Sequence, residues 1–137
     1  MVKNIVRDPV FLQLPSEQAT RDDLQTARDL ADTLSENREI CVGLAANMIG
    51  VRKTILAAML KKGITVMINP VLKSHSSEVT ETEEGCLSLV GVRKAERYKV
   101  ITVEYNDMNF RKKVCTLRGF EAQIVQHEMD HFRGVLI

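Results

Sequence analysis

The sequence feature that most constrains this chain is the string His127-Glu128-Met129-Asp130-His131, an H-E-x-x-H pattern. Residues four apart lie above one another on an α-helix, so a helical segment lets His127 and His131 share one metal ion. Glu128 is then offset beside them, where it can accept and return a proton. Asp130 has two interpretations, a hydrogen-bonding partner of one histidine or an ordinary solvated charge. The string predicts a helix that faces a metal.

A catalytic metal site of this kind needs a third protein ligand. Six residues follow His131, and none of them binds a metal well, so we expect the ligand upstream. Cys86 is favoured, because Gly85 permits a close backbone approach and Leu87 offers a peptide N–H beside the thiolate. A Cys/His/His site that keeps a position open for water is a hydrolytic arrangement. The other upstream candidates are several carboxylates, His75, Cys41 and Cys115.

Composition narrows the class of protein. The 137 residues contain 45% hydrophobic residues, enough for one globular domain spanning residues 1–137. The 19 basic and 18 acidic residues nearly cancel and form no dominant run, so neither nucleic-acid binding nor a membrane surface is indicated. The three cysteines are irregularly spaced, which favours reduced thiols. We therefore expect a cytoplasmic protein without disulfides.

Hydrophobic periodicity predicts an α+β fold of mostly antiparallel strands, with one helix near each end of the chain. The first helix is expected to be capped by Thr20 and to run past Leu34, and the last to run from Gly119 to Phe132 and stop at Gly134. The remaining expected elements are a surface arm over residues 5–15, paired strands over 53–60 and 64–68 ended by Asn69-Pro70, and a hairpin over 98–105 and 110–117.

Three stretches, residues 41–48, 84–88 and 127–131, resemble the motifs of the peptide deformylase family. Those motifs are G-x-G-L-A-A-x-Q, E-G-C-L-S and H-E-x-D-H, and they occur here in the family's order. The resemblance covers nearly the whole chain. It implies a deformylase-like fold, in which mostly antiparallel strands pack around a C-terminal helix that carries H-E-x-x-H.

The resemblance also implies roles at the reaction centre. Cys86, His127 and His131 would hold one divalent ion, iron(II) in the usual case, with zinc, nickel or cobalt as substitutes. Glu128 would act as general acid and base, and the Leu87 N–H would donate to the oxygen that becomes negative during attack.

The same resemblance implies a peptide cleft. Gly43 would hydrogen-bond the substrate backbone, and an arginine after the second motif would hold the peptide. We assign that role to Arg97, with Arg93 as the alternative. The other residues that we expect at the substrate are Val42, Met48, Glu84, Phe120, Gln123 and Ile124.

Two residues of the first motif depart from the family pattern, Cys41 in place of its first glycine and Met48 in place of its glutamine. Met48 stands where the motif has a glutamine whose amide donates to the oxyanion, and losing one such donor costs about 10²–10³ in turnover. Plain core packing is the other interpretation of Met48. Gln123 lies one helical turn before His127, where an apolar residue would suit a methionine side chain. It points either into the site or partly to solvent.

The expected function is hydrolysis of the N-formyl group from N-formylmethionyl peptides of newly made proteins, with release of formate. The ribosome is one place where the protein would meet these peptides. Two alternatives stay open. The chain could act weakly or on another N-acyl amide, as Met48 and Gln123 would favour. It could instead be a metal-bound peptide-binding protein with little catalysis, although the presence of Glu128 argues against this.

Overall fold

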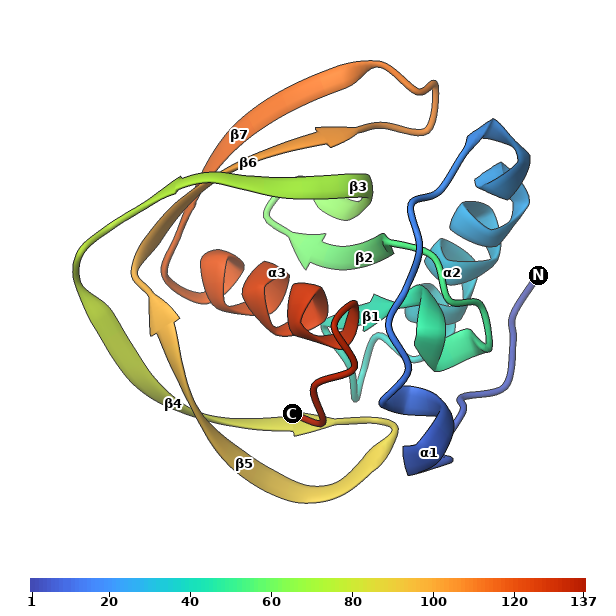
Figure 1. The fold of residues 1–137 in the computed structure, drawn as a ribbon, viewed down its shortest axis with the longest axis horizontal. Coiled ribbons are helices and arrows are strands. Elements are labelled where there is room, and N and C mark those ends of the chain that lie inside the picture. Colours follow the sequence, from blue (N-terminus) through green and yellow to red (C-terminus); the bar gives the residue numbers. More distant parts are fainter.

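The fold consists of a five-stranded antiparallel sheet, a separate two-stranded hairpin and two long helices (Figure 1). The computed structural model describes residues 1–137. The sheet has the order β1-β2-β3-β6-β7, and the hairpin pairs β4 with β5. The strands are β1 (Gly43–Ala45), β2 (Ile55–Leu60), β3 (Gly63–His75), β4 (Val79–Cys86), β5 (Leu89–Tyr98), β6 (Val100–Asn106) and β7 (Lys112–Arg118).

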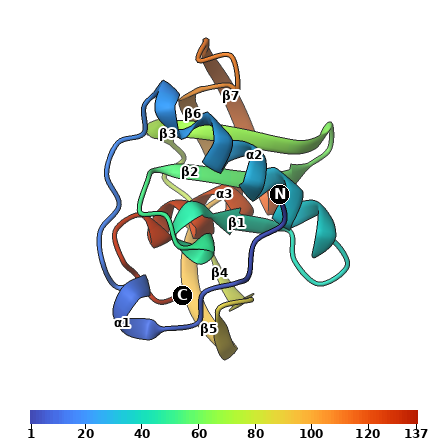
Figure 2. The ribbon, with the colours of Figure 1, turned by 90° about the vertical axis from the view of Figure 1, so that its right-hand side faces the viewer.

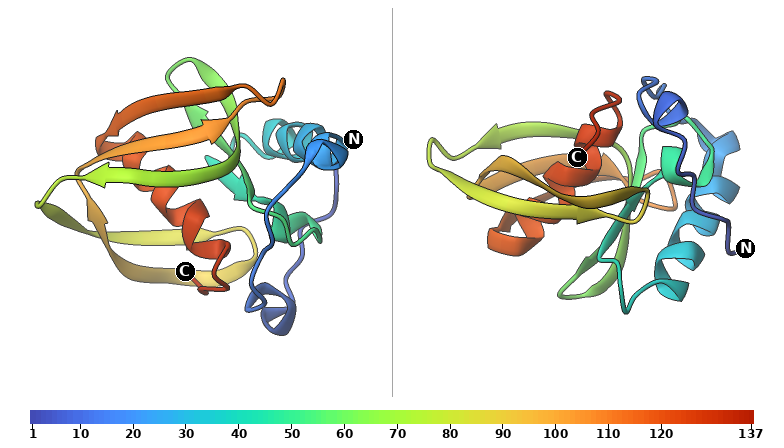
Figure 3. Two further views of the ribbon diagram at one scale, coloured as in Figure 1. Left: turned by 45° about the horizontal axis from the view of Figure 1, so that its top comes forward. Right: turned by 90° about the horizontal axis from the view of Figure 1, so that it is seen from below.

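Helix α3 (Gly119–His131) lies enclosed between the sheet and the β4–β5 hairpin (Figure 1), and it contacts strands of both. Helix α2 (Leu24–Glu36) packs on the other side of β1 and β2 (Figures 2 and 3). The short helices are α1 (Pro9–Leu12), η1 (Arg21–Asp23) and η2 (Ala46–Ile49). This arrangement confirms the predicted α+β fold with a helix near each end.

The start of the first long helix follows the predicted capping chemistry. Thr20 accepts from the Asp22 N–H, and Asp23 accepts from the Thr20 N–H at 2.8 Å, which satisfies donors that the helix start leaves free. The first turn is a 3₁₀ turn, and α2 continues from it. Its apolar side chains at Ala27, Leu30 and Leu34 are fully buried, as the helical spacing predicted.

The predicted strand pairs β2–β3 and β6–β7 are confirmed, but β3 does not end at Asn69-Pro70. It continues to His75 through an irregularity between Ile68 and Val71. Asn69 has a positive φ of 52°, and its side-chain amide bonds both the N–H and the carbonyl of Ala19. A bulge tolerates proline because the ladder is interrupted there, so the turn signal marked a bulge and not a strand end.

Two other elements differ from the sequence-based prediction. The arm over residues 5–15 contains the short helix α1, which begins at Pro9 and is capped by the Asp8 carboxylate bonding the Val10 N–H at 3.0 Å. The β4–β5 hairpin was not predicted. Its residues are mostly polar, and the side chains that it buries are the charged Glu84 and Arg97, so it lacks the apolar alternation that identifies a half-buried strand.

Gly134 ends the C-terminal helix segment as predicted. Its φ is +73°, and its N–H bonds the His131 carbonyl at 3.1 Å. A Cβ at this position would lie 2.1 Å from the carbonyl oxygen of Gln13, so only glycine lets the chain pass the N-terminal arm here.

We predict that Gly134→Ala destabilises the protein more than Gly119→Ala does. Both glycines have a positive φ near +60° to +73°, which costs a side chain about 1–2 kcal/mol. A Cβ at Gly119 meets nothing within 4 Å, whereas Gly134→Ala adds a clash of about 1–3 kcal/mol. Urea unfolding of both variants measures the difference, and equal losses would show that the arm yields without cost.

Candidate metal centre

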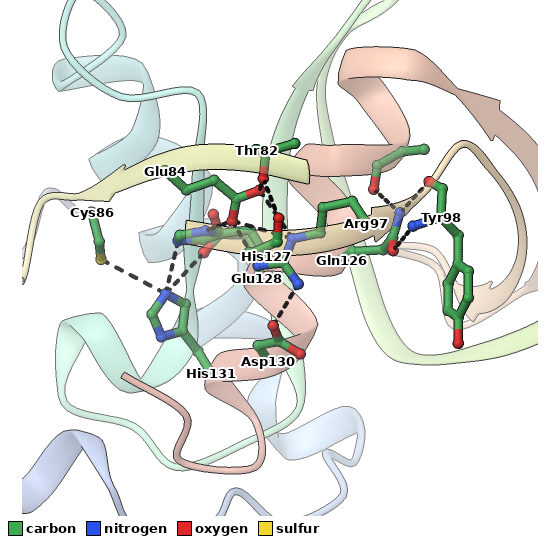
Figure 4. A network of polar contacts seen from close by, with 12 residues as sticks. Thr82, Glu84, Cys86, Arg97, Tyr98, Gln126, His127, Glu128, Asp130 and His131 are labelled. Atoms are coloured by element: carbon green, nitrogen blue, oxygen red, sulfur yellow. Dashed lines mark hydrogen bonds and ion pairs between the residues drawn. The ribbon is translucent and has the colours of Figure 1, made fainter. Parts of the chain in front are cut away.

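The structure brings Cys86, His127 and His131 together. Their ligand atoms all lie within 4.8 Å of one another. The Nε2 atom of His131 is 3.7 Å from the Cys86 Sγ and 3.2 Å from the His127 Nε2 (Figure 4). Both histidines are buried. A thiolate and two imidazoles that converge in a buried position form a donor set suited to a divalent metal ion.

The three side chains come from two elements that are distant in sequence. Cys86 is the last residue of β4, where the pairing with β5 shifts register after Gly85. His127 and His131 lie on the last two turns of α3, on the face that the hairpin covers. The candidate third ligand therefore lies upstream, at the position that the sequence favoured. Cys41 and Cys115 lie outside this group.

Glu84 fixes the orientation of His127 (Figure 4). Its Oε1 accepts from the His127 Nδ1 at 2.8 Å, which directs the Nε2 atom toward the other ligand atoms. Glu84 also accepts from Arg97, at 2.6 Å from Nη2, and from the Thr82 hydroxyl at 2.7 Å. Burial opposes the charge of Glu84, but these hydrogen bonds outweigh it and hold its pKa well below the ordinary value.

The position of Arg97 argues against its predicted role of holding the peptide substrate. Its side chain is buried between Glu84 and Asp130, with the Nη1 atom 2.6 Å from the Asp130 carboxylate, and it does not line the cavity beside the metal ligands. A guanidinium engaged on both sides has no free edge for a peptide. Asp130 does not steer a histidine either, because its partners are Arg97 and Arg133. Arg93 also lies outside the cavity wall.

The surroundings of the two histidines favour one neutral ring and one that attracts positive charge. Burial and repulsion from His127 lower the pKa of His131 to about 3, so this imidazole is neutral. Burial also disfavours a charged His127, yet the thiol of Cys86 and the carboxylate of Glu84 raise its pKa to about 10. A neighbourhood that attracts a proton at this point attracts a metal cation for the same electrostatic reason.

Glu128 is placed to transfer protons. It is buried, its Oε1 has no hydrogen-bond partner, and that atom lies 3.9 Å from the His131 Nε2. Burial raises the pKa of Glu128 to about 7, close to the value that suits a general base at neutral pH. Gly43 makes room for this carboxylate, because a Cβ there would lie 2.7 Å from the Glu128 Oε2.

A cavity of about 570 Å³ opens beside the ligands. Most of the residues predicted at the site line it, namely Val42, Gly43, Glu84, Cys86, Leu87, Phe120, Gln123, Ile124, His127 and Glu128. Gln123 therefore faces the cavity. The other wall residues, none of which was assigned to the substrate from the sequence, are Arg38, Glu39, Ile40, Cys41, Glu83, Gly85 and Gly91. Arg38 is the one arginine in the wall.

Met48 does not line the cavity. Its side chain is 1% exposed and packs in the hydrophobic core, so the core-packing interpretation holds and its predicted place at the substrate is wrong. Cys41, the other departure from the motif, lies in the cavity wall. Burial raises the pKa of the Cys41 thiol to about 12, and the thiol donates to the Gly43 carbonyl at 2.9 Å.

Two backbone segments border the cavity with hydrogen-bonding groups. β1 is an edge strand that pairs with β2 alone, so no strand covers the other side of Gly43, whose carbonyl accepts from the Cys41 thiol. Leu87 lies in the turn between β4 and β5, and its N–H has no acceptor among the turn and loop hydrogen bonds. Its carbonyl accepts from the Arg7 guanidinium of the N-terminal arm.

Fold and site together define a metallohydrolase-type centre, with two helix-borne histidines, a strand-borne cysteine and a buried glutamate. A family model described as polypeptide deformylase matches residues 2–137. A peptide deformylase from Clostridium beijerinckii is 54% identical over 137 residues, which is 100% of each chain. Peptide deformylase 1 from Clostridium perfringens is 41% identical over 111 residues, covering 79% of this chain and 74% of that protein.

Solved structures agree with the sequence matches. The class I type b peptide deformylase from Acinetobacter baumannii has a TM-score of 0.88 at 28% identity, covering 99% of this chain and 97% of that one. The peptide deformylase from Thermotoga maritima has a TM-score of 0.88 at 29% identity, covering 99% and 95%. The chain belongs to the polypeptide deformylase family, which is a family of hydrolases. The resemblance of the motifs is confirmed.

None of the helices combines the length and the apolar character that crossing a bilayer requires.

We predict that Glu84→Gln weakens metal binding by about 10–100-fold, because the partner that orients His127 loses its charge. It should also lower the free energy of unfolding by about 3–5 kcal/mol, since the buried Arg97 loses a carboxylate. Cobalt(II) titration and urea unfolding measure the two effects. Thr82→Val is the control: it removes one neutral donor to Glu84 and should change both quantities less.

The same variant has an expected pH signature. Because the pKa of Glu84 is lower in the folded protein than in the unfolded chain, its stabilising effect is complete above the unfolded value of about 4.3 and is lost as the pH falls below it. Glu84→Gln should therefore flatten the loss of stability between neutral pH and about pH 3. If the free energy of unfolding of Glu84→Gln fell with decreasing pH as steeply as that of the unmodified protein, the assigned role of Glu84 would be contradicted.

Proposed function

We propose that this chain, acting as one catalytic domain over residues 1–137, hydrolyses the N-formyl group of N-formylmethionyl peptides. Family membership supports the reaction class, and the observation that carries the proposal is the joint placement of Cys86, His127, His131 and Glu128 beside one cavity. An unreactive binding protein would not need a buried carboxylate with a pKa near 7 next to the ligand atoms.

In this proposal Cys86, His127 and His131 hold a divalent ion. When bound, the ion supplies the Lewis acidity that makes water nucleophilic near neutral pH. Glu128 takes a proton from the attacking water and passes it to the amine nitrogen as the formyl C–N bond breaks. The products are formate and a free N-terminal amine. The Leu87 N–H donates to the carbonyl oxygen as that oxygen becomes negative, a role supported by its lack of an acceptor.

The cavity wall supports a peptide substrate that begins with a side chain of moderate size. Val42, Phe120 and Ile124 supply apolar surface, and the open edge of β1 at Gly43 offers backbone groups to an extended peptide. One structural neighbour, the deformylase from Acinetobacter baumannii, was solved with Met-Ala-Ser bound. We infer that a methionine side chain enters the corresponding cavity here.

We further propose iron(II) as the resident ion, with zinc, nickel or cobalt as functional substitutes. The mixed sulfur and nitrogen donor set suits all four ions, and the resemblance of the motifs favours iron. Formylated nascent peptides, met in the cytoplasm at or near the ribosome, are the proposed partners.

Hydrolysis of a different N-acyl amide is the second candidate function. Gln123 supports it, because this side chain lines the cavity, where its amide can meet a polar group of the substrate. A formyl-methionyl substrate offers only a thioether to that part of the wall.

The deciding experiment is formate release from a formyl-methionyl tripeptide by protein loaded anaerobically with iron(II) or nickel(II). Glu128→Ala should lower kcat by about 10²–10⁴-fold, since the proton carrier is lost. Cys86→Ala should lose the metal, as measured by metal content. Full occupancy of the Cys86→Ala protein would sink the three-ligand assignment. A higher rate with an acetyl or longer acyl peptide would favour the second candidate.

Met48→Gln tests whether position 48 contributes to the reaction. Because Met48 packs in the core and does not line the cavity, the added amide would be buried away from the substrate. We therefore expect no rise in kcat for formate release, and a free energy of unfolding lower by about 1–3 kcal/mol in urea. Met48→Leu is the matched control, because it changes the buried side chain without adding a polar group. A folded Met48→Gln protein with a kcat about 10²-fold above that of Met48→Leu would show that the centre lacks the donor of the family pattern.

A further inference from the structure

We propose that Asn47 is a positioning residue for the metal centre: its side-chain amide holds the main chain of His131, and thereby the ligand ring, in place. Asn47 lies in the 3₁₀ turn η2 and is fully buried. Its Nδ2 atom donates to the His131 carbonyl oxygen at 3.2 Å, across 84 residues of sequence. The inference rests on the metal site of the proposed function and is independent of the substrate.

The hydrogen bond from Asn47 can position a ligand because it lies at the end of α3. α3 ends at His131, and the last carbonyls of a helix have no partner within the helix. The His131 carbonyl accepts from the Gly134 N–H at 3.1 Å on one side and from Asn47 on the other. His131 therefore supplies a candidate metal ligand through its side chain, and its backbone carbonyl anchors the end of α3 to the buried turn η2.

The amide of Asn47 has only one workable orientation. Its Oδ1 atom is buried and has no hydrogen-bond partner. Turning the amide over would set that oxygen against the His131 carbonyl, two acceptors facing each other, and would leave the carbonyl without this donor. A buried acceptor without a partner is costly, so its presence here points to a requirement for the Nδ2 donor.

Asn47 does not replace the amide that the family motif has at the next position. It does not line the cavity, and its donor is used by the helix end. The two neighbouring side chains thus have separate tasks, with Met48 filling the core and Asn47 reaching α3.

The turn that carries Asn47 is well anchored. The Gly50 N–H donates to the Asn47 carbonyl at 3.1 Å, and the Val51 N–H donates to the Ala46 carbonyl at 3.1 Å. The Val6 N–H of the N-terminal arm donates to the Met48 carbonyl at 2.8 Å. A fixed turn on one side and a helix end on the other restrict where the His131 ring can lie. Metal–ligand distances tolerate about 0.2 Å, so a helix end that moves freely lowers metal affinity.

The test compares Asn47→Ala with Asn37→Ala. Asn37 makes the same kind of contact at the end of α2, where its Nδ2 donates to the Thr33 carbonyl at 2.8 Å, but α2 carries no metal ligand. Cobalt(II) affinity is measured by chelator competition, the ligand field by the visible absorption spectrum, and stability by the Tm of the metal-free proteins. Asn47→Ser is a milder variant in case Asn47→Ala does not fold.

We expect Asn47→Ala and Asn47→Ser to raise the cobalt(II) Kd by about 10–100-fold and to shift the absorption bands, as loss of support behind a ligand does. Asn37→Ala should lower the Tm but leave Kd and spectrum unchanged. The inference is overturned if the folded Asn47 variants bind cobalt(II) like the unmodified protein, or if Asn37→Ala weakens binding equally. Cobalt(II) binding without formate release would instead count against the proposed function alone.

Discussion

The buried carboxylate of Glu84 is the interaction on which the site depends. It joins a strand of the hairpin to the helix by bonding His127, and it neutralises Arg97, which in turn bonds Asp130 on the last turns of the same helix. A buried guanidinium is stable only with its partners in place, so the hairpin and α3 must meet in one register. That register delivers the cysteine of β4 to the two histidines.

The burial of α3 between the sheet and the hairpin changes the pKa of side chains that face the site. The helix is covered by the sheet on one side and by the hairpin on the other (Figures 1 and 3), so Glu128 is shielded from water and its pKa rises. Gly43 allows the edge of β1 to approach this carboxylate closely. The same edge remains open to a peptide, which places a proton carrier, a metal-ligand set and a backbone partner around one cavity.

Much of this architecture could be read from local patterns. The helical spacing of α2 and α3 and the turn signals between β6 and β7 depend on neighbours in sequence, and these elements formed where they were expected. The hairpin of β4 and β5 could not be identified in this way, because its pattern is polar and the side chains that it buries, Glu84 and Arg97, are charged. The prediction that a strand ends at Asn69-Pro70 was wrong for a related reason. Turns and β-bulges favour the same residue types, so the sequence does not distinguish a strand end from a bulge within a strand.

The sequence by itself identified the candidate ligands and the candidate proton carrier, since the spacing of His127, Glu128 and His131 on one helix face and the motif around Cys86 are local properties. Only the tertiary structure decided which charged and amide groups support them. Arg97 belongs behind the ligands and not at the substrate, Met48 belongs to the core, and Asn47 ties the end of α3. The roles of Arg97 and Asn47 depend on contacts with residues 33 and 84 positions away in the sequence. The type of a side chain does not indicate which distant residue it will bond, because only packing brings the two segments together.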